Sequence, residues 1–346
     1  MTSQSTSAAP SGSPGRQRLH IVSGKGGTGK TTVAGALALA LARQGKRVLL
    51  AEVEGRQGIS QTFDVPPLGD LETSILTDSS GGEIVGLSVD AKTALLEYLQ
   101  KFYKLGRAGS VLEKVGAIDF ATTIAPGVRD VLLIGRVYEA VGRAAPGRHA
   151  SGPAFDAVVL DAPPTGRIVR FLNVNTEVAH VAKVGPIRTQ AESIMRLLQG
   201  PQTVVHLVTL LEEMPVQETL DAAEELAETS LRLGSIVLNQ VRDTLVPADQ
   251  TTRLVGSVAA RGEGGELHDG VRDDLRSVGL KPTEAVVAGL LAQGRDHLER
   301  IGLQAEMEAK VAAAGLPVRR LPHLTDGLDS GGLAVLADAL TEQGMI

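Results

Sequence analysis

Apolar runs and helical stretches alternate along the first part of the chain. Residues 19–23 form a short apolar run with β-branched members, which predicts a strand, and residues 47–53 predict a second one. Between them, residues 31–43 are rich in alanine and leucine, which predicts a buried helix that ends before Gly45. Because strand, helix and strand follow one another so closely, we expect a βαβ unit and a parallel sheet.

The same alternation returns in the second half of the chain. We expect strands at residues 155–160, 203–210, 235–239 and 316–321. Residues 215–233 predict a helix with a proline in its first turn, acidic residues early and an arginine late. Nearly continuous apolar strands suit a sheet that is covered by helices on both faces. The predicted fold class is therefore α/β, with a mainly parallel sheet flanked by helices.

Several stretches interrupt this rhythm. Residues about 90–150 and 173–200 are mainly helical in pattern, and we expect them to form a helical subdomain inserted between strands. Residues 262–274 are rich in glycine and acids, which predicts a loop. Residues 1–17 are rich in serine, threonine, proline and glycine, which predicts a disordered tail. We therefore expect one domain over residues 18–340.

A glycine-rich segment joins the first predicted strand to the first predicted helix. Gly24, Gly29, Lys30 and Thr31 match the pattern G-x-x-x-x-G-K-[ST] of a P-loop NTPase. Glycines let successive backbone N–H groups turn toward a phosphate, and the following helix directs its positive end at the same anion. In this pattern the lysine neutralises the β- and γ-phosphates and the threonine hydroxyl ligates Mg²⁺. The candidate ATP-binding residues are Gly26, Gly27, Thr28, Gly29, Lys30, Thr31 and Thr32.

A second candidate site residue follows the predicted strand at residues 155–160. Asp161 stands at the end of that strand, where a Walker B carboxylate would hold Mg²⁺ directly or through water. The alternative is an ordinary acid at a boundary between strand and turn. With the phosphate loop upstream, we expect Asp161 and Thr31 to be the two metal-site residues.

One lysine in the loop is not required for phosphate binding in general. Lys25 follows the first glycine, and the run from Gly24 to Thr31 resembles the deviant Walker A loop of the nitrogenase-iron-protein, septum-site-determining and chromosome-partition ATPases. The resemblance implies that Lys25 reaches across a dimer and touches the nucleotide of the partner. It therefore implies an ATP-dependent homodimer, or a heterodimer with a paralogous ATPase.

Further motifs resemble one branch of that class, the arsA-type and tail-anchored-protein-targeting ATPases. Residues 160–167 are similar to the switch II sequence of this family, and residues 125–128 and 236–240 are similar to two other family motifs. The resemblance spans roughly residues 18–340 and implies that Asn239 recognises adenine, while Pro322 flanks the base. For Asn239, a simple cap at a strand end remains the alternative.

The sequence departs from this family after the second predicted strand. The family has an aspartate there that positions the attacking water, and alignment of the following residues puts Glu54 at its place. Glutamate is one methylene longer, and a displacement near 1 Å can reduce a rate about 100-fold. Lys25, Lys30 and Glu54 are the candidate catalytic residues. The alternative function is a hydrolytically weak regulatory or scaffold subunit that pairs with a paralogous ATPase.

Composition narrows the possible ligands and partners. The chain contains no cysteine, which excludes disulfides, iron–sulfur clusters, arsenite coordination by thiolates and the Cys-x-x-Cys zinc site that ties the dimer in the targeting branch. The formal net charge of −6 and the low aromatic content of 2% disfavour nucleic acid as a partner. No apolar run approaches the roughly 20 residues of a membrane span, so we expect a cytoplasmic protein.

An apolar helical client is a further candidate partner. Leu95, Leu99, Phe102 and Tyr103 share one face of a predicted helix and can line an apolar surface, although ordinary core packing is the simpler explanation. Met195 is the one methionine in a candidate groove helix, whereas flexible client grooves are usually rich in methionine.

Overall fold

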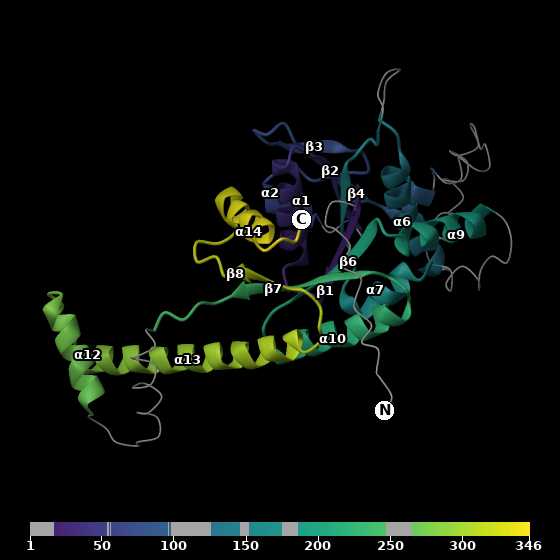
Figure 1. Cartoon of the computed structure of the whole chain (residues 1–346). Coiled ribbons are helices and arrows are strands. Elements are labelled where there is room, and N and C mark those ends of the chain that lie inside the picture. Colours follow the sequence, from purple (N-terminus) through teal and green to yellow (C-terminus); the bar gives the residue numbers. More distant parts are fainter. Residues whose placement is uncertain are drawn as a thin grey trace, which may run out of the picture.

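The fold is built on one mixed sheet with helices on both faces. The computed structural model describes residues 17–53, 55, 57–95, 97, 126–145, 152–174, 186–246 and 265–346. Within these residues eight strands pair in the order β3-β4-β2-β5-β1-β6-β7-β8 (Figure 1). All neighbouring pairs are parallel except β3 and β4, which are antiparallel. The predicted α/β class with a mainly parallel sheet is confirmed.

The bounds of the elements agree with most of the predicted strands. The strands are β1 Leu19–Gly24, β2 Arg47–Val53, β3 Thr73–Thr77, β4 Glu83–Val89, β5 Ala157–Asp161, β6 Thr203–Thr209, β7 Leu233–Val241 and β8 Val318–Pro322. The helices are α1 Lys30–Arg43, α2 Gly58–Phe63, α6 Pro126–Gly142, α7 Thr165–Leu172, α9 Pro186–Leu198, α10 Glu213–Glu228, α12 Glu266–Ser277, α13 Glu284–Ala312 and α14 Ser330–Glu342.

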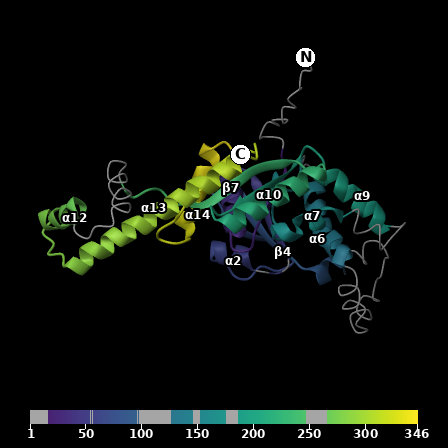
Figure 2. The same ribbon diagram turned by 90° about the horizontal axis from the view of Figure 1, so that it is seen from below.

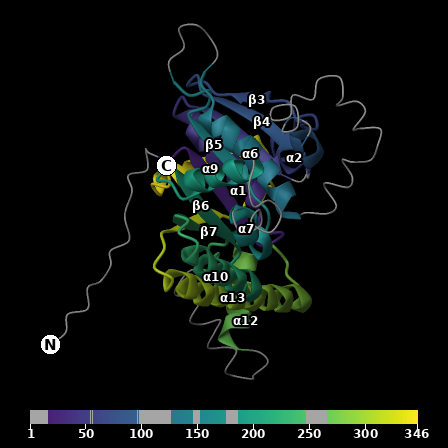
Figure 3. The same ribbon diagram turned by 90° about the vertical axis from the view of Figure 1, so that its right-hand side faces the viewer.

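Two apolar clusters lie on the two faces of the sheet. One contains buried side chains of α6, α7, α9, α10 and the end of α13, and the other contains those of α1 and α14. Nearly every residue of α1 is buried, because this helix lies between the sheet and α14. Figure 3 shows α10 and α13 running side by side along the first of these faces.

Two strands were not predicted. β3 and β4 form an antiparallel hairpin at one edge of the sheet, with Gly81 of the turn at φ 87°. β3 is mostly exposed or half-buried, as an edge strand is, so its sequence lacks a continuous apolar run. Both strands precede the stretch in which the inserted subdomain was expected.

The expected helical insertions are described only in part. α6 and α9 are helical as predicted, whereas residues 98–125 and 175–185 lie outside the described residues. Leu95 is buried, and Leu99, Phe102 and Tyr103 lie outside the described part of the chain. Met195 is buried in the first apolar cluster rather than open to a groove. Residues 1–16 of the expected tail also lie outside the described residues.

The predicted loop at residues 262–274 is wrong for residues 266–274, while residues 262–264 lie outside the described part of the chain. Residues 266–277 form α12, which crosses the far end of α13, away from the sheet (Figures 1 and 2). Leu267, Val271 and Leu275 recur at helical spacing and pack against Val287 and Leu291 of α13. The glycine- and acid-rich composition suggested a loop, but the apolar stripe gains a partner once α13 is present.

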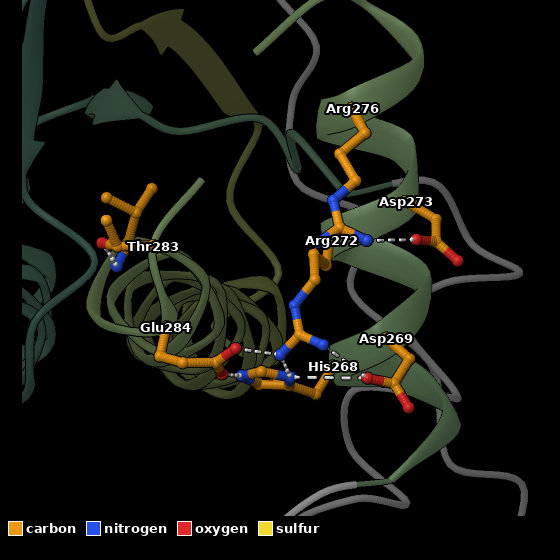
Figure 4. Close-up of polar contacts among 8 residues, drawn as sticks. His268, Asp269, Arg272, Asp273, Arg276, Thr283 and Glu284 are labelled. Atoms are coloured by element: carbon orange, nitrogen blue, oxygen red, sulfur yellow. Dashed lines mark hydrogen bonds and ion pairs between the residues drawn. The ribbon is translucent and has the colours of Figure 1, made fainter. Parts of the chain in front are cut away.

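Polar contacts connect α12 to the start of α13 (Figure 4). Arg272 forms an ion pair with Glu284 and a second one with Asp269, and His268 Nε2 lies 3.2 Å from Glu284 Oε2. Thr283 caps α13 by accepting a hydrogen bond from the backbone N–H of Val286. Among the described helices, none has both the length and the apolar character that crossing a membrane requires.

Candidate functional site

The phosphate loop connects the end of β1 to the start of α1. Gly27 and Gly29 have positive φ angles of 87° and 83°, which glycine adopts without strain. A Cβ atom at Gly24 would lie 2.2 Å from the carbonyl oxygen of Val208 in the neighbouring strand β6, so a side chain is excluded there. The predicted order of strand, glycine-rich loop and helix is therefore the order that the structure shows.

The polar side chains of the loop turn inward. Lys30 Nζ donates a hydrogen bond of 3.2 Å to the carbonyl oxygen of Lys25, and Thr28 Oγ1 donates one of 2.8 Å to the same oxygen. Lys30 and Thr28 are buried, Thr31 and Thr32 are half-buried on α1, and Gly26 and Gly27 are exposed. The loop therefore offers exposed backbone at its tip and a buried ammonium group beneath it.

The two expected metal-site residues are in direct contact. Thr31 Oγ1 donates a hydrogen bond of 2.6 Å to Oδ2 of Asp161, whose side chain is buried at the end of β5. Their contact follows from the topology, because β5 pairs with β1 and brings Asp161 opposite Val22. Ser23 Oγ also donates to the carbonyl oxygen of Pro163, 2.7 Å away, which ties the segment after β5 to the loop.

The donor atoms of this pair fit magnesium. Mg²⁺ prefers oxygen ligands and is usually held by one or two protein groups together with substrate phosphates. The hydroxyl of Thr31 and the carboxylate of Asp161 supply such oxygens beside the phosphate loop. Within the described ranges no cluster of three or more His, Asp or Glu residues could hold a metal by itself. The arrangement therefore suits a cation that arrives with a nucleotide.

Asn239 reaches the phosphate loop from the end of β7. Its Nδ2 donates a hydrogen bond of 2.8 Å to the carbonyl oxygen of Thr28, and its Oδ1 accepts one of 3.0 Å from the backbone N–H of Gln240. The second contact is local and lies within β7, which continues to Val241. Pro322 ends β8, where it pairs with Val241, and it is half-buried.

A hollow of about 470 Å³ lies beside Asn239. Its walls come from the segment between β6 and α10, from the end of β7 and from the second half of α13; they are Leu210, Leu211, Glu212, Glu213, Asn239, Gln240, Arg242, Arg300, Leu303, Gln304, Glu306, Met307 and Lys310. Asn239 therefore stands between this hollow and the phosphate loop.

Lys25 is bound to a carboxylate of its own chain. Its Nζ lies 2.7 Å from Oε1 of Glu218 on α10, with side chains that are 30% and 38% exposed. The sequence did not single out Glu218, because nothing in the local pattern of α10 distinguishes it from the other acids of that helix. In this structure Lys25 points along the protein's own surface.

The candidate catalytic residue Glu54 lies outside the described residues. The residue two positions earlier, Glu52, is described, and the sequence analysis missed it. Its carboxylate is buried and accepts hydrogen bonds from the residues that begin α2. A charged residue near the end of an otherwise apolar strand was the signal that could have found it.

A buried histidine pair lies in β1, which leads into the phosphate loop, and in β6, the strand that pairs with β1. His20 Nδ1 lies 3.3 Å from Nε2 of His206, and the two rings are stacked. Burial, with a smaller effect of the charge of Lys46, lowers the pKa of His20 to about 4. Burial also lowers the pKa of His206 well below the usual value of histidine. Both imidazoles are therefore neutral parts of the core at neutral pH.

Comparison with known proteins identifies the family. The sequence model described as anion-transporting ATPase matches residues 17–200, which include the phosphate loop and Asp161. The chain belongs to the anion-transporting ATPase family. The resemblance inferred from the loop, from switch II and from the other motifs is thereby confirmed, and so is the assignment to the ATPases.

Individual relatives support the same assignment. The chain is 48% identical over 329 residues to a protein named ATPase BagA from Mycobacterium tuberculosis H37Rv, covering 95% of this chain and 94% of that protein. It is 24% identical over 250 residues to putative arsenical pump-driving ATPase 2 of Aquifex aeolicus, covering 70% and 75%. It is 25% identical over 353 residues to an arsenical pump-driving ATPase of Acidiphilium multivorum, covering 93% of this chain and 54% of that protein.

Proposed function

We propose that this family member binds MgATP at residues 24–31, hydrolyses it, and couples the nucleotide state to dimer closure and to the binding of a partner or client. The observation that carries the proposal is the 2.6 Å contact between Thr31 and Asp161 at the base of a glycine-rich loop. A hydroxyl and a carboxylate in this position are the pair that holds Mg²⁺ next to the β- and γ-phosphates in P-loop ATPases.

Each part of the loop has its own task. The backbone N–H groups of Gly26 to Gly29 and the start of α1 hold the phosphates, because the helix macrodipole favours an anion at that end. Lys30 moves its ammonium group from the carbonyl of Lys25 to the phosphate oxygens. Thr31 and Asp161 hold Mg²⁺, which, when bound, offsets the negative charge of the transferred phosphoryl group.

Asn239 and Pro322 are the proposed contacts of the adenine base. Support comes from Asn239, which touches the phosphate loop on one side and faces the hollow of about 470 Å³ on the other. Pro322 ends the neighbouring strand β8. A base held beside Asn239 would remain within reach of the loop that holds its phosphates.

Dimer closure is proposed to depend on Lys25. In the closed state Lys25 leaves Glu218 and contacts the nucleotide of the partner, which is a second copy or a paralogous ATPase. With no cysteine in the chain, nucleotide and protein contacts hold the dimer together. The proposal places this dimer in the cytoplasm, with an apolar helix as candidate client.

Hydrolysis needs a residue that orients the attacking water, and Glu54 is the proposed one. The second candidate function is a hydrolytically weak regulatory subunit that pairs with a paralogous ATPase. The glutamate at position 54, where related sequences have aspartate, and the exposed Arg167 in switch II favour this alternative.

Steady-state ATP turnover separates the two functions. The purified chain is measured alone and mixed with its paralogue, at millimolar MgATP. Turnover by the chain alone supports an independent ATPase, and turnover that depends on the paralogue supports the regulatory subunit. Lys30→Ala is the control, because loss of the ammonium group must abolish any turnover that comes from this site. Turnover that survives Lys30→Ala would contradict the proposal.

A further inference from the structure

Glu52 is a charged residue in the interior, at the carboxyl end of β2. It is only 1% exposed and lies opposite Asp161 in the pairing of β2 with β5. Removing a carboxylate from water is costly unless hydrogen bonds replace the lost hydration. The buried carboxylate of Glu52 therefore depends on the groups that donate hydrogen bonds to it.

Three donors surround the carboxylate. Oε1 accepts hydrogen bonds of 2.8 Å from the backbone N–H of Gln57 and of 3.0 Å from Oγ of Ser88, and Oε2 accepts one of 3.1 Å from the backbone N–H of Ile59. Gln57 and Ile59 flank the first residue of α2, whereas Ser88 belongs to β4. Glu52 thus links the first turn of α2 to two neighbouring strands of the sheet.

The first turn of α2 touches the proposed metal-site threonine. A Cβ atom at Gly58 would lie 3.0 Å from Cγ2 and 3.1 Å from Oγ1 of Thr31, so the backbone of Gly58 packs directly on that side chain. Gln57 has a positive φ angle of 56°, and its side chain is bonded to both backbone groups of Leu68 at 2.8 Å. The turn is therefore held from two sides, by Glu52 and by Leu68.

We infer that Glu52 is a positioning residue for ATP hydrolysis. Its carboxylate holds the first turn of α2, from Gln57 to Ile59, against Thr31, and this fixes where that turn faces the phosphate loop. The inference rests on the proposed hydrolysis at this loop. Glu52 itself does not contact the nucleotide. Loss of its carboxylate should therefore affect the chemical step more than the binding of nucleotide.

Two substitutions weaken the anchor to different degrees. Glu52→Gln replaces one accepting oxygen by an NH₂ group that cannot accept from Ile59, and Ser88→Ala removes one donor and leaves the charge in place. We expect kcat to fall at least about 10-fold for Glu52→Gln and about 3-fold for Ser88→Ala, because small displacements of reacting groups are costly. KM for MgATP and Kd for MgADP should change less than about 3-fold.

The matched control is Glu83→Gln. Glu83 is a carboxylate at the opposite end of β4, paired with Arg47 near the surface. This variant should keep the wild-type kcat. Unchanged kcat in both Glu52→Gln and Ser88→Ala would overturn the inference, and so would a loss of kcat that is matched by an equal loss of MgADP affinity.

Hydrogen exchange tests the anchor without relying on turnover. In the nucleotide-free chain, Glu52→Gln should raise the exchange rates of the Gln57 and Ile59 amides at least about 10-fold relative to wild type, because local opening becomes easier. Exchange that is unchanged would overturn the inference. Wild-type protein that binds MgADP but shows no turnover would instead contradict the proposed hydrolysis, so the two failures are distinguishable.

Discussion

Lys25 Nζ lies 2.7 Å from Oε1 of Glu218, so the lysine expected to cross a dimer is paired with its own chain. Both side chains are about one-third exposed, and a pair of this kind is worth at most about 1 kcal/mol. The bond is therefore weak enough to exchange for a phosphate of the partner in the proposed closed dimer.

Neutralising Glu218 should favour closure. In Glu218→Gln, Lys25 loses its ionic partner, and we expect nucleotide-dependent dimerisation to occur at about 2- to 5-fold lower protein concentration. Sedimentation velocity with MgATP or a non-hydrolysable analogue measures the dimer fraction. Glu224→Gln, at an exposed position of the same helix, is the control and should dimerise like wild type. A weaker dimer in Glu218→Gln would show that the pair supports the closed state instead.

Removing the side chain of Asn239 tests two roles at once. Asn239→Ala leaves the carbonyl oxygen of Thr28 without its 2.8 Å hydrogen bond, and an unsatisfied buried group costs about 1–3 kcal/mol. If Asn239 also binds adenine, the affinity for MgATP should fall by at least about 10-fold, whereas that for inorganic tripolyphosphate should fall less. Calorimetric titration of both ligands makes the comparison. Equal losses of affinity for the two ligands would show that Asn239 supports the loop and does not recognise the base.

Stability should fall in mild acid because of the histidine pair. Burial lowers the pKa of His20 to about 4 in the folded protein, so between the unfolded value of 6.5 and about 4 the unfolded chain binds more protons. The free energy of unfolding is therefore highest above pH 6.5, where His20 is neutral in both states, and it decreases as the pH falls. At pH 5 the loss from His20 alone is about 2 kcal/mol, and the lowered pKa of His206 acts in the same direction.

Urea unfolding at pH 7 and pH 5 measures this loss. In His20→Gln the difference between the two pH values should shrink, because one titrating group of the pair is gone. His297→Gln serves as the control, since His297 is half-buried and bonds to the backbone of Leu245. An equal pH dependence in wild type and His20→Gln would contradict the assignment.

The parts of the site that were predictable are local in sequence. The strand, glycine loop and helix around residues 19–43 form one continuous segment, and Asp161 ends an apolar strand. Long-range contacts gave no such signal. Glu218 beside Lys25 belongs to no local pattern, and Glu52 stands out only as a charge near the end of an apolar strand. The partners of both residues come from segments that the fold brings together.

The errors in the fold have the same origin. β3 was missed because an edge strand needs no continuous apolar run. The composition of α12, rich in glycine and acids, predicts a loop. Val271 and Leu275 stabilise a helix there only because they pack against α13. In both cases the tertiary environment outweighs the local preference of the sequence.

Binding of MgADP, measured by isothermal titration, tests the central claim most directly. The account predicts saturable binding to the wild-type chain with a Kd in the micromolar range, and binding at least about 100-fold weaker in Lys30→Ala. Asp161→Asn should reduce the affinity for MgADP more than the affinity for ADP without magnesium, because the carboxylate holds the metal beside Thr31. A wild-type chain that gives no heat with MgADP, or a Lys30→Ala variant that binds as tightly as wild type, would contradict the assignment of nucleotide binding to this loop.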